Sequence, residues 1–230
     1  MMPNKGDTAM VRQYFALVAY SVVLVIAGCG GGGSSSSPPT TYNLDTFASN
    51  YAQAKHDYTL SASNNGDAYT VTLSQVPGSA AACGTTQAHT VTVTVHVSEN
   101  GSLIDDDTYT RYYLLNPYKL VCDYDDINGY VTIYANQKAL PATANIGDSG
   151  SADTSTTYYD TSLTTVFGSS TDTWNLKSSS GGNALFCADS VSKTDNGNSS
   201  ENDCYTLTAG GNAAGLMVTL TINGVTLNFQ

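Results

Sequence analysis

The sequence predicts an all-β domain, an antiparallel sandwich with a barrel as the alternative, preceded by one short helix. Three observations lead to this prediction. Apolar and polar residues alternate over several short stretches, turn residues recur between those stretches, and Thr, Val and Tyr are abundant. Alternation is the period of a half-buried strand, and β-branched and aromatic side chains pack well on sheets. We therefore expect a single β domain over residues 42–230.

The first expected element is a helix over residues 43–55. Leu44, Phe47 and Tyr51 recur at helical spacing, which is typical of a helix with one buried face. Asn43 precedes them, and Asn is among the residues that cap helix N-termini by accepting a backbone hydrogen bond. The sequence indicates no other helix in the domain.

The strands follow the helix. The clearest one covers residues 90–97, where Val91, Val93, Val95 and Val97 alternate with Thr and His. The chain ends in an expected hairpin, because Asn223-Gly224 separates two alternating stretches and an Asn-Gly turn accommodates positive φ at both positions. The remaining expected strands cover residues 69–74, 108–115, 118–124, 130–135, 171–177, 184–189, 205–208, 216–222 and 225–229. A Gly-, Ser- and Asp-rich stretch at 141–155 is an alternative boundary between two halves.

Composition excludes one class of partner. The chain has 230 residues, a formal net charge of −11 and only eight Lys and Arg, so it lacks the basic surface on which nucleic-acid binding depends. Charged residues make up 12% of the chain, against about 25% in an ordinary soluble protein. At 41% hydrophobic residues, the chain is able to build a core.

The N-terminus is predicted to be a signal peptide over residues 1–28. Lys5 and Arg12 precede the apolar stretch 14–28, which is shorter than the roughly 20 residues that cross a membrane as a helix. A basic start, an apolar centre and small residues before a cleavage site are typical of secretory signal peptides. The next four-residue motif, Ile26-Ala27-Gly28-Cys29, resembles the lipobox of bacterial lipoproteins.

This resemblance implies cleavage before Cys29 and attachment of diacylglycerol to its thiol, followed by acylation of the new N-terminus with a fatty acid such as palmitate. It also implies an outer-membrane location, since Gly30 stands where an aspartate favours retention at the inner membrane. Residues 29–41 read as the lipidated cysteine and a Gly/Ser/Pro tether, which is a flexible coil. The expected partner is therefore the membrane, through the lipid anchor.

Four cysteines remain after Cys29, and an even number in an exported chain indicates disulfides. Three pairings are possible. We favour Cys187 with Cys204 and Cys83 with Cys122, because strand-like flanks surround Cys187 and Cys204 and a polar loop, residues 193–202, lies between them. Zinc is disfavoured because the chain has no Cys-x-x-Cys pair and only three His.

No stretch carries a catalytic signature, and we predict a protein that is not an enzyme and needs no cofactor. Asp123, Asp125 and Asp126 form a weak calcium candidate, since clustered carboxylates in a loop can bind Ca²⁺. However, these residues lack the EF-hand order, and we expect no metal site. Solvated turns account for Asp and Asn in such loops equally well.

Tyrosines crowd into the middle of the chain, with seven between Tyr109 and Tyr134. Tyr serves a sheet interior and a glycan-binding surface alike, so both interpretations stay open. Residues 140–159, Phe186-Cys187 and Cys204-Tyr205 resemble β-rich lipoproteins of Gram-negative bacteria with no known activity, and this likeness implies the fold class only. We expect a non-catalytic binding or structural domain in the envelope; the alternatives are an adhesive or glycan-binding surface module, or an exported hydrolase. Possible partners are a glycan or another envelope protein.

Overall fold

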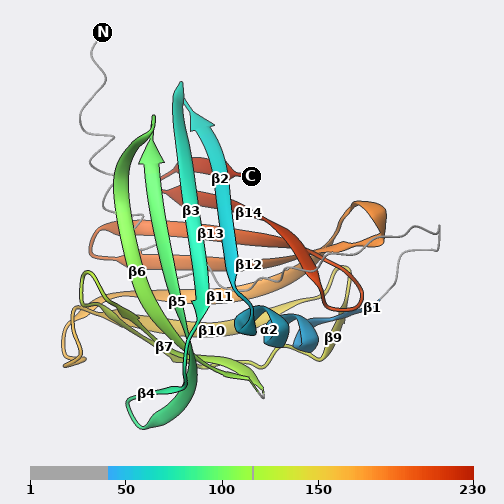
Figure 1. The fold of residues 1–230 in the computed structure, drawn as a ribbon, viewed down its shortest axis with the longest axis horizontal. Helices are drawn as coiled ribbons and strands as arrows, with labels where there is room; N and C mark the ends of the chain where they lie inside the picture. The colour runs from blue at the N-terminus through green and yellow to red at the C-terminus, as the bar shows by residue number, and fades with distance from the viewer. Residues whose placement is uncertain (1–40, 116) are drawn as a thin grey trace.

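A computed structural model describes residues 41–115 and 117–230 of the chain. The predicted signal peptide, Cys29 and all but the last residue of the tether lie outside the described residues. Strands dominate the fold, and they form one long antiparallel sheet with a single α-helix (Figure 1). The all-β prediction is confirmed.

The sheet contains twelve strands of the described chain in the order β15-β14-β13-β12-β11-β10-β8-β7-β6-β5-β3-β2. Most neighbours in the sheet are also neighbours in sequence, so the sheet is an antiparallel meander. Short β4 (Ala81–Cys83) adds to β5, and β1 (Thr41–Asn43) pairs with β9 (Thr143–Asn145) in a separate ribbon. The long strands are β2 (His56–Asn64), β3 (Asp67–Pro77), β5 (Thr86–Glu99), β6 (Ser102–Leu115), β7 (Tyr118–Asp125), β8 (Val131–Ala135), β10 (Ser149–Tyr158), β11 (Val166–Ser178), β12 (Ala184–Thr194), β13 (Gly197–Leu207), β14 (Ala213–Ile222) and β15 (Val225–Phe229).

The sheet curls until its two ends meet, which makes it a nearly closed barrel rather than the sandwich placed first from sequence. Ser61 of β2 and Gln230, directly after β15, exchange two backbone hydrogen bonds of 3.0 and 3.1 Å. The front strands β2, β3, β5 and β6 run steeply across the rear strands β12–β14 (Figure 1). Within the described residues these two bonds are the only backbone hydrogen bonds between the outer strands, so the barrel is closed at a single point.

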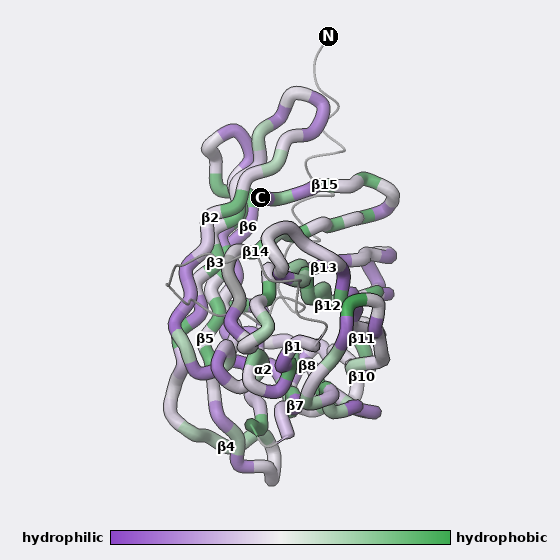
Figure 2. Tube along the Cα trace, turned by 90° about the vertical axis from the view of Figure 1, so that its right-hand side faces the viewer, coloured by the Kyte–Doolittle hydropathy of each residue, from purple (hydrophilic) through white to green (hydrophobic). Residues whose placement is uncertain are grey.

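Helix α2 (Leu44–Gln53) packs against the inner face of the sheet near one end (Figure 2). Asn43 caps it by accepting a 2.9 Å hydrogen bond from the Thr46 amide, as predicted. Phe47 lies 5.0 Å from Phe186 between ring centroids, and the Tyr113 hydroxyl donates to the Ala52 carbonyl. The apolar face of the helix therefore fills the barrel interior, where its burial stabilises the fold.

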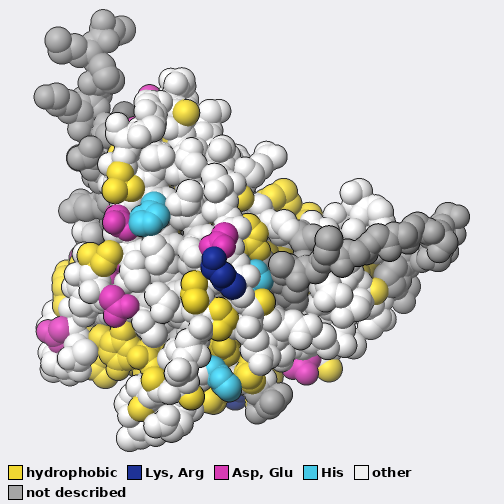
Figure 3. Space-filling model, viewed as in Figure 1, with side chains coloured by type: hydrophobic (Ala, Val, Ile, Leu, Met, Phe, Trp, Pro, Cys, Tyr) yellow, Lys and Arg dark blue, Asp and Glu magenta, His cyan; other side chains and the backbone are white. Residues whose placement is uncertain are grey.

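The interior is divided between apolar and polar regions. Strands β14, β15, β2, β3 and β5 contribute mostly aliphatic side chains, including the four valines of residues 91–97. The inner faces of β6, β7, β10, β11 and β13 carry buried or half-buried polar and charged groups as well. By contrast, the outer face seen in Figure 3 is mostly uncharged, in keeping with the low charge of the chain.

The strand assignments from sequence need correction in several places, since the short strands β1, β4 and β9 were not expected. β2 and β10 were not expected either, and the polar loop predicted at 193–202 is largely strand, because β12 continues to Thr194 and β13 begins at Gly197. β2 does alternate, with Tyr58, Leu60 and Ala62 facing the core, whereas polar residues occupy both faces of β10 and of the strand ends at 193–202. Asp153, Ser155 and Thr157 of β10 face a polar part of the interior, so the alternation that marks an ordinary strand is lost.

Candidate functional site

The wall of the barrel is interrupted beside β8, which is only five residues long. β8 pairs with β7 over residues 122–124 and with β10 over residues 154–158. The rest of β7 and the first half of β10 therefore have no strand between them. Residues 136–142 cover this gap, and they bridge it because the Lys138 amide donates to Ala152 of β10 (2.7 Å) while the Gln137 side chain donates to the Leu120 carbonyl of β7.

A cavity of about 90 Å³ lies behind the covering segment, and we call it the side pocket. It reaches the surface, since exposed Lys138 and Thr173 line it together with buried Trp174 and Phe186. Its lining residues come from β7, the covering segment and β10–β12: Tyr118, Lys119, Leu120, Gln137, Lys138, Leu140, Ala152, Asp153, Asp172, Thr173, Trp174, Phe186, Ala188, Asp189 and Ser190.

Two carboxyl groups share the polar side of the pocket. Asp153 of β10 and Asp172 of β11 lie directly opposite each other in the strand register. Burial, followed by a hydrogen bond and charge repulsion from Asp172, raises the pKa of Asp153 to about 8. The pair therefore retains one proton at neutral pH, because two adjacent carboxylates cannot easily both ionise in a partly buried site. Beyond the hydrogen bond between the two carboxyl groups, no donor of the described residues reaches buried Asp153 Oδ1.

Aromatic side chains form the apolar side of the pocket. Trp174, the only tryptophan of the chain, is 6% exposed and lies parallel to Phe186 at a centroid distance of 6.1 Å. Gly150 makes room for the indole, because a Cβ at that position would stand 2.8 Å from Trp174 Nε1. The indole can therefore lie directly against the backbone at Gly150.

A buried charge network lies next to the carboxyl pair. Arg111 of β6 donates from Nε and Nη2 to Asp123 of β7, at 2.9 and 2.7 Å to the two carboxylate oxygens. The Tyr134 hydroxyl donates to the same carboxylate at 2.7 Å. Arg111 and Asp123 influence the pKa of Asp153 in opposite directions, the arginine lowering it and the carboxylate raising it. The network therefore forms part of the electrostatic environment of the pocket.

The weak calcium candidates do not share a common site in the described part of the chain. Asp123 forms an ion pair with Arg111 inside the barrel, whereas Asp125 accepts hydrogen bonds from the amides of Ile127 and Asn128. Asp126 is exposed and accepts from Thr110. Within residues 41–115 and 117–230, no three His, Cys, Asp or Glu side chains are arranged to hold a metal ion. Alternation separates only Asp126 from Asp125; Asp123 and Asp125 share the buried face of β7, where each already has other hydrogen-bond partners.

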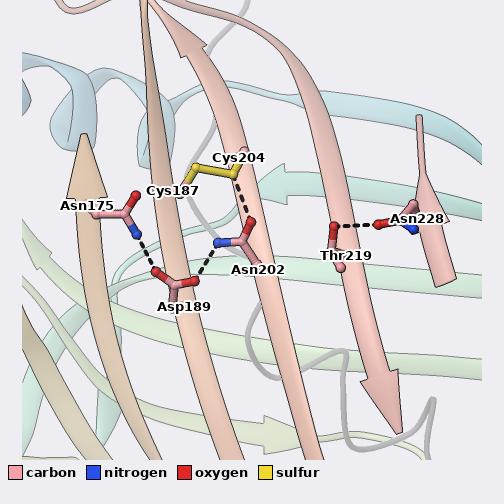
Figure 4. Close-up of a disulfide and its surroundings, with 7 residues drawn as sticks. All are labelled: Asn175, Cys187, Asp189, Asn202, Cys204, Thr219 and Asn228. Carbon is pink, nitrogen blue, oxygen red and sulfur yellow. Dashed lines mark hydrogen bonds between the residues drawn. A yellow bond between two sulfur atoms is a disulfide. The ribbon is translucent and has the colours of Figure 1, made fainter. Parts of the chain in front are cut away.

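Both predicted disulfides are present. Cys83 pairs with Cys122, and Cys187 pairs with Cys204 across the directly opposed strands β12 and β13. Figure 4 shows the second disulfide beside Asp189, which accepts hydrogen bonds from the side-chain amides of Asn175 and Asn202. This arrangement fastens β11, β12 and β13 together on the face of the sheet opposite to Phe186. Cys29 lies outside the described residues.

The described tyrosines are nearly all buried or half-buried. Among the described tyrosines only Tyr159 is exposed, at 40%, and its hydroxyl donates to Asp195. Tyr42, Tyr51, Tyr109 and Tyr205 are fully buried. A surface cluster of tyrosines, which a glycan-binding face would favour, is not found in the described part of the chain.

The sequence reasoning missed Asp153, Asp172 and Trp174. Asp172 and Trp174 stand two residues apart, so a strand places both on one face, and that spacing was the available signal. Their meeting with Asp153 depends on the register between β10 and β11, including a bulge between Ser151 and Asp153. Local patterns do not determine such a register.

No match was found for this chain among protein-family models, curated proteins or solved structures. In the described ranges, none of the helices has the length and apolar character that spanning a bilayer requires. The site must therefore be interpreted from its own geometry.

Proposed function

We propose that this chain is a lipid-anchored protein of the bacterial outer membrane whose barrel-like domain binds a small ligand without converting it. The observation that carries the proposal is the side pocket: a cavity at a break in the barrel wall, with aromatic side chains on one side and the Asp153–Asp172 pair on the other. Concave, mostly apolar pockets with a few convergent polar groups are typical of ligand sites.

The anchor part of the proposal rests on the lipobox-like motif ending at Cys29 and on the flexible tether after it. Acyl chains hold a protein in a leaflet because each buried CH₂ contributes about 0.8 kcal/mol. Expressed in a Gram-negative host, the wild-type chain should incorporate labelled palmitate and fractionate with outer membranes. Cys29→Ser should abolish both. Palmitate incorporation by the Cys29→Ser variant would contradict the anchor.

The binding part can be tested with the full chain in neutral detergent, because the only tryptophan lines the pocket. We expect at least one member of a panel of small sugars, amines, amino acids and carboxylic acids to change Trp174 fluorescence saturably. Ala188→Phe, which fills the pocket, should abolish the change, whereas Ala135→Phe, on an exposed position of β8, should not. A saturable response that survives Ala188→Phe would place binding elsewhere.

Two other functional classes receive less support. An adhesive or glycan-binding surface would use exposed tyrosines, and among the described tyrosines only Tyr159 is exposed. An assembly scaffold would use an open strand edge; the outer edges of β2 and β15 are joined at Ser61 and Gln230, and residues 136–142 cover the gap between β7 and β10.

Hydrolysis is the second candidate, and the Asp153–Asp172 pair is the observation that favours it. One carboxylate could take a proton from water while the neighbouring carboxylic acid protonates a leaving group, which is general acid–base chemistry. Turnover of chromogenic ester, peptide or glycoside substrates, lost in Asp153→Asn and Asp172→Asn, would replace the binding proposal with an enzymatic one.

A further inference from the structure

We infer that the side pocket binds a primary ammonium group carried on a short apolar stem. This inference rests on the proposed function, because it names the chemical class of the ligand. Three features of the pocket carry it: the hydrogen-bonding character of its polar side, the surrounding charge, and the size and composition of its apolar side.

The polar side offers acceptors. Asp153 and Asp172 provide carboxyl oxygens, and beyond the hydrogen bond between the two carboxyl groups no donor of the described residues reaches buried Asp153 Oδ1. A buried oxygen that no other donor reaches calls for an explanation, such as a ligand that supplies the missing donor. An ammonium group presents three donors and no acceptor, which complements these oxygens. A sugar hydroxyl acts as both donor and acceptor and would leave part of its hydrogen-bonding capacity unused there.

The surrounding charge is negative. Asp153 and Asp172 are both acidic, and the charges of Asp172 and Asp123 raise the pKa of Asp153. Arg111 is the nearby cation, but Asp123 and Tyr134 already engage its guanidinium. Arg111 therefore neutralises Asp123 first and leaves the carboxyl pair available for a second cation.

Two lysines also line the pocket. Lys138 is exposed on the covering segment, and Lys119 is half-buried on β7. The charged groups with the largest effect on Asp153 are Asp172, Arg111 and Asp123, and neither lysine is among them.

The apolar side limits the stem. Tyr118, Leu120, Trp174 and Phe186 surround the space beside the carboxyl pair. An apolar cavity of roughly 150 Å³ takes up benzene, so a cavity of about 90 Å³ limits the apolar stem to a short chain of at most about four carbons. Aromatic faces also attract a cation directly. A short alkylammonium therefore fits both the shape and the charge of the pocket.

The experiment titrates the full chain in neutral detergent with n-butylammonium, 1-butanol and butyrate at constant ionic strength and pH 7. These probes share one stem and differ in charge. We expect a saturable change of Trp174 fluorescence with n-butylammonium, binding at least tenfold weaker with 1-butanol, and no saturable response with butyrate. Because Trp174 is the only tryptophan, the signal reports on the pocket.

Variants test the role of the carboxyl pair. Asp153→Asn combined with Asp172→Asn should weaken n-butylammonium binding at least tenfold, while Asp126→Asn, on an exposed carboxylate, should leave it unchanged. Near-wild-type circular dichroism and thermal unfolding establish that each variant is folded. If the double variant does not fold, Asp172→Asn alone should still weaken binding, because it removes one acceptor.

The outcomes separate this inference from the proposed function. Equal saturable binding of all three probes, lost in Ala188→Phe, would overturn the ammonium preference and keep the pocket as a binding site. Tighter binding of butyrate than of n-butylammonium would likewise overturn the ammonium preference and keep the pocket as a binding site. If neither these probes nor the wider ligand panel perturbs Trp174 saturably, both the inference and the proposed function fail.

Discussion

Arg111 and Asp123 form a bidentate ion pair in the barrel interior, with both side chains at most 1% exposed. The guanidinium also lies 5.4 Å from the centroid of the Tyr109 ring and donates to the Tyr134 hydroxyl. Taking both charges out of water is costly, and the pair offsets that cost only while each partner is present. The pair therefore makes stability sensitive to single substitutions within the polar part of the core.

Replacing only one partner of the Arg111–Asp123 pair should strongly destabilise the fold. Arg111→Met leaves a buried carboxylate without its cation, and we expect a loss of about 3–5 kcal/mol in the free energy of unfolding, measured by urea denaturation. The double variant Arg111→Met/Asp123→Leu should recover most of this loss, since no lone charge remains. A loss below about 1 kcal/mol in the single variant would show that the pair is hydrated or replaceable.

Stability should fall as pH rises through the neutral range. Burial, together with neighbouring carboxylates, raises the pKa of Asp107 to about 7 and that of Asp153 to about 8. The folded protein therefore binds these protons more tightly than the unfolded chain does. The resulting stabilisation is complete below about pH 4, where the unfolded carboxyls also protonate, and it is lost as pH rises through the folded values.

The measurement is the thermal unfolding midpoint at pH 5, 6, 7 and 8. The midpoint should decline over this range, and Asp153→Asn should flatten the decline because an amide needs no proton to remain neutral. Asp160→Asn, at an exposed carboxylate whose pKa is lowered by Ser162 hydrogen bonds, should leave the slope unchanged. A midpoint that increases from pH 5 to pH 8 would contradict this assignment.

Each disulfide should stabilise the domain by restricting the unfolded chain. Cys187 and Cys204 are 17 residues apart and Cys83 and Cys122 are 39 apart, so loop-closure entropy predicts contributions of about 3 and about 4 kcal/mol. Paired Cys→Ala substitutions with urea denaturation measure each contribution. The reverse order of effects would indicate that residual structure or native-state strain outweighs loop length.

Gly211 should be essential for docking of α2. It has a φ of +81°, and a Cβ there would stand 2.8 Å from the Asn43 carbonyl oxygen at the start of the helix. Gly211→Ala should therefore cost the positive-φ penalty plus about 1–3 kcal/mol for overpacking.

Gly215→Ala is the matched control for Gly211→Ala. Gly215 has a φ of +72° but open space around its missing Cβ, so this substitution should cost only the backbone penalty. The difference between the two unfolding free energies isolates the steric term. Equal losses would show that the helix shifts to accommodate the methyl group.

Local sequence determined much of the secondary structure. The four alternating valines lie buried in β5, Asn43 caps α2, and Asn223-Gly224 turns between β14 and β15 with φ of +46° and +86°. The Cys187–Cys204 pairing was accessible for the same reason, because a hairpin brings its two flanks into register. These features depend on interactions between residues close in sequence, where side-chain period and turn preference are decisive.

Only the tertiary structure decided the closure and the side pocket. Whether the sheet forms a sandwich or a barrel depends on β2 meeting the chain end at Ser61 and Gln230, and no local pattern encodes contact across the whole domain. Likewise, the sequence gives no sign that Asp153, Asp172 and Arg111 face inward. A polar residue in a strand is normally predicted to face the solvent. Their burial becomes evident only once the partners from β6, β7, β10 and β11 are assembled, since a buried charge persists only beside a compensating group.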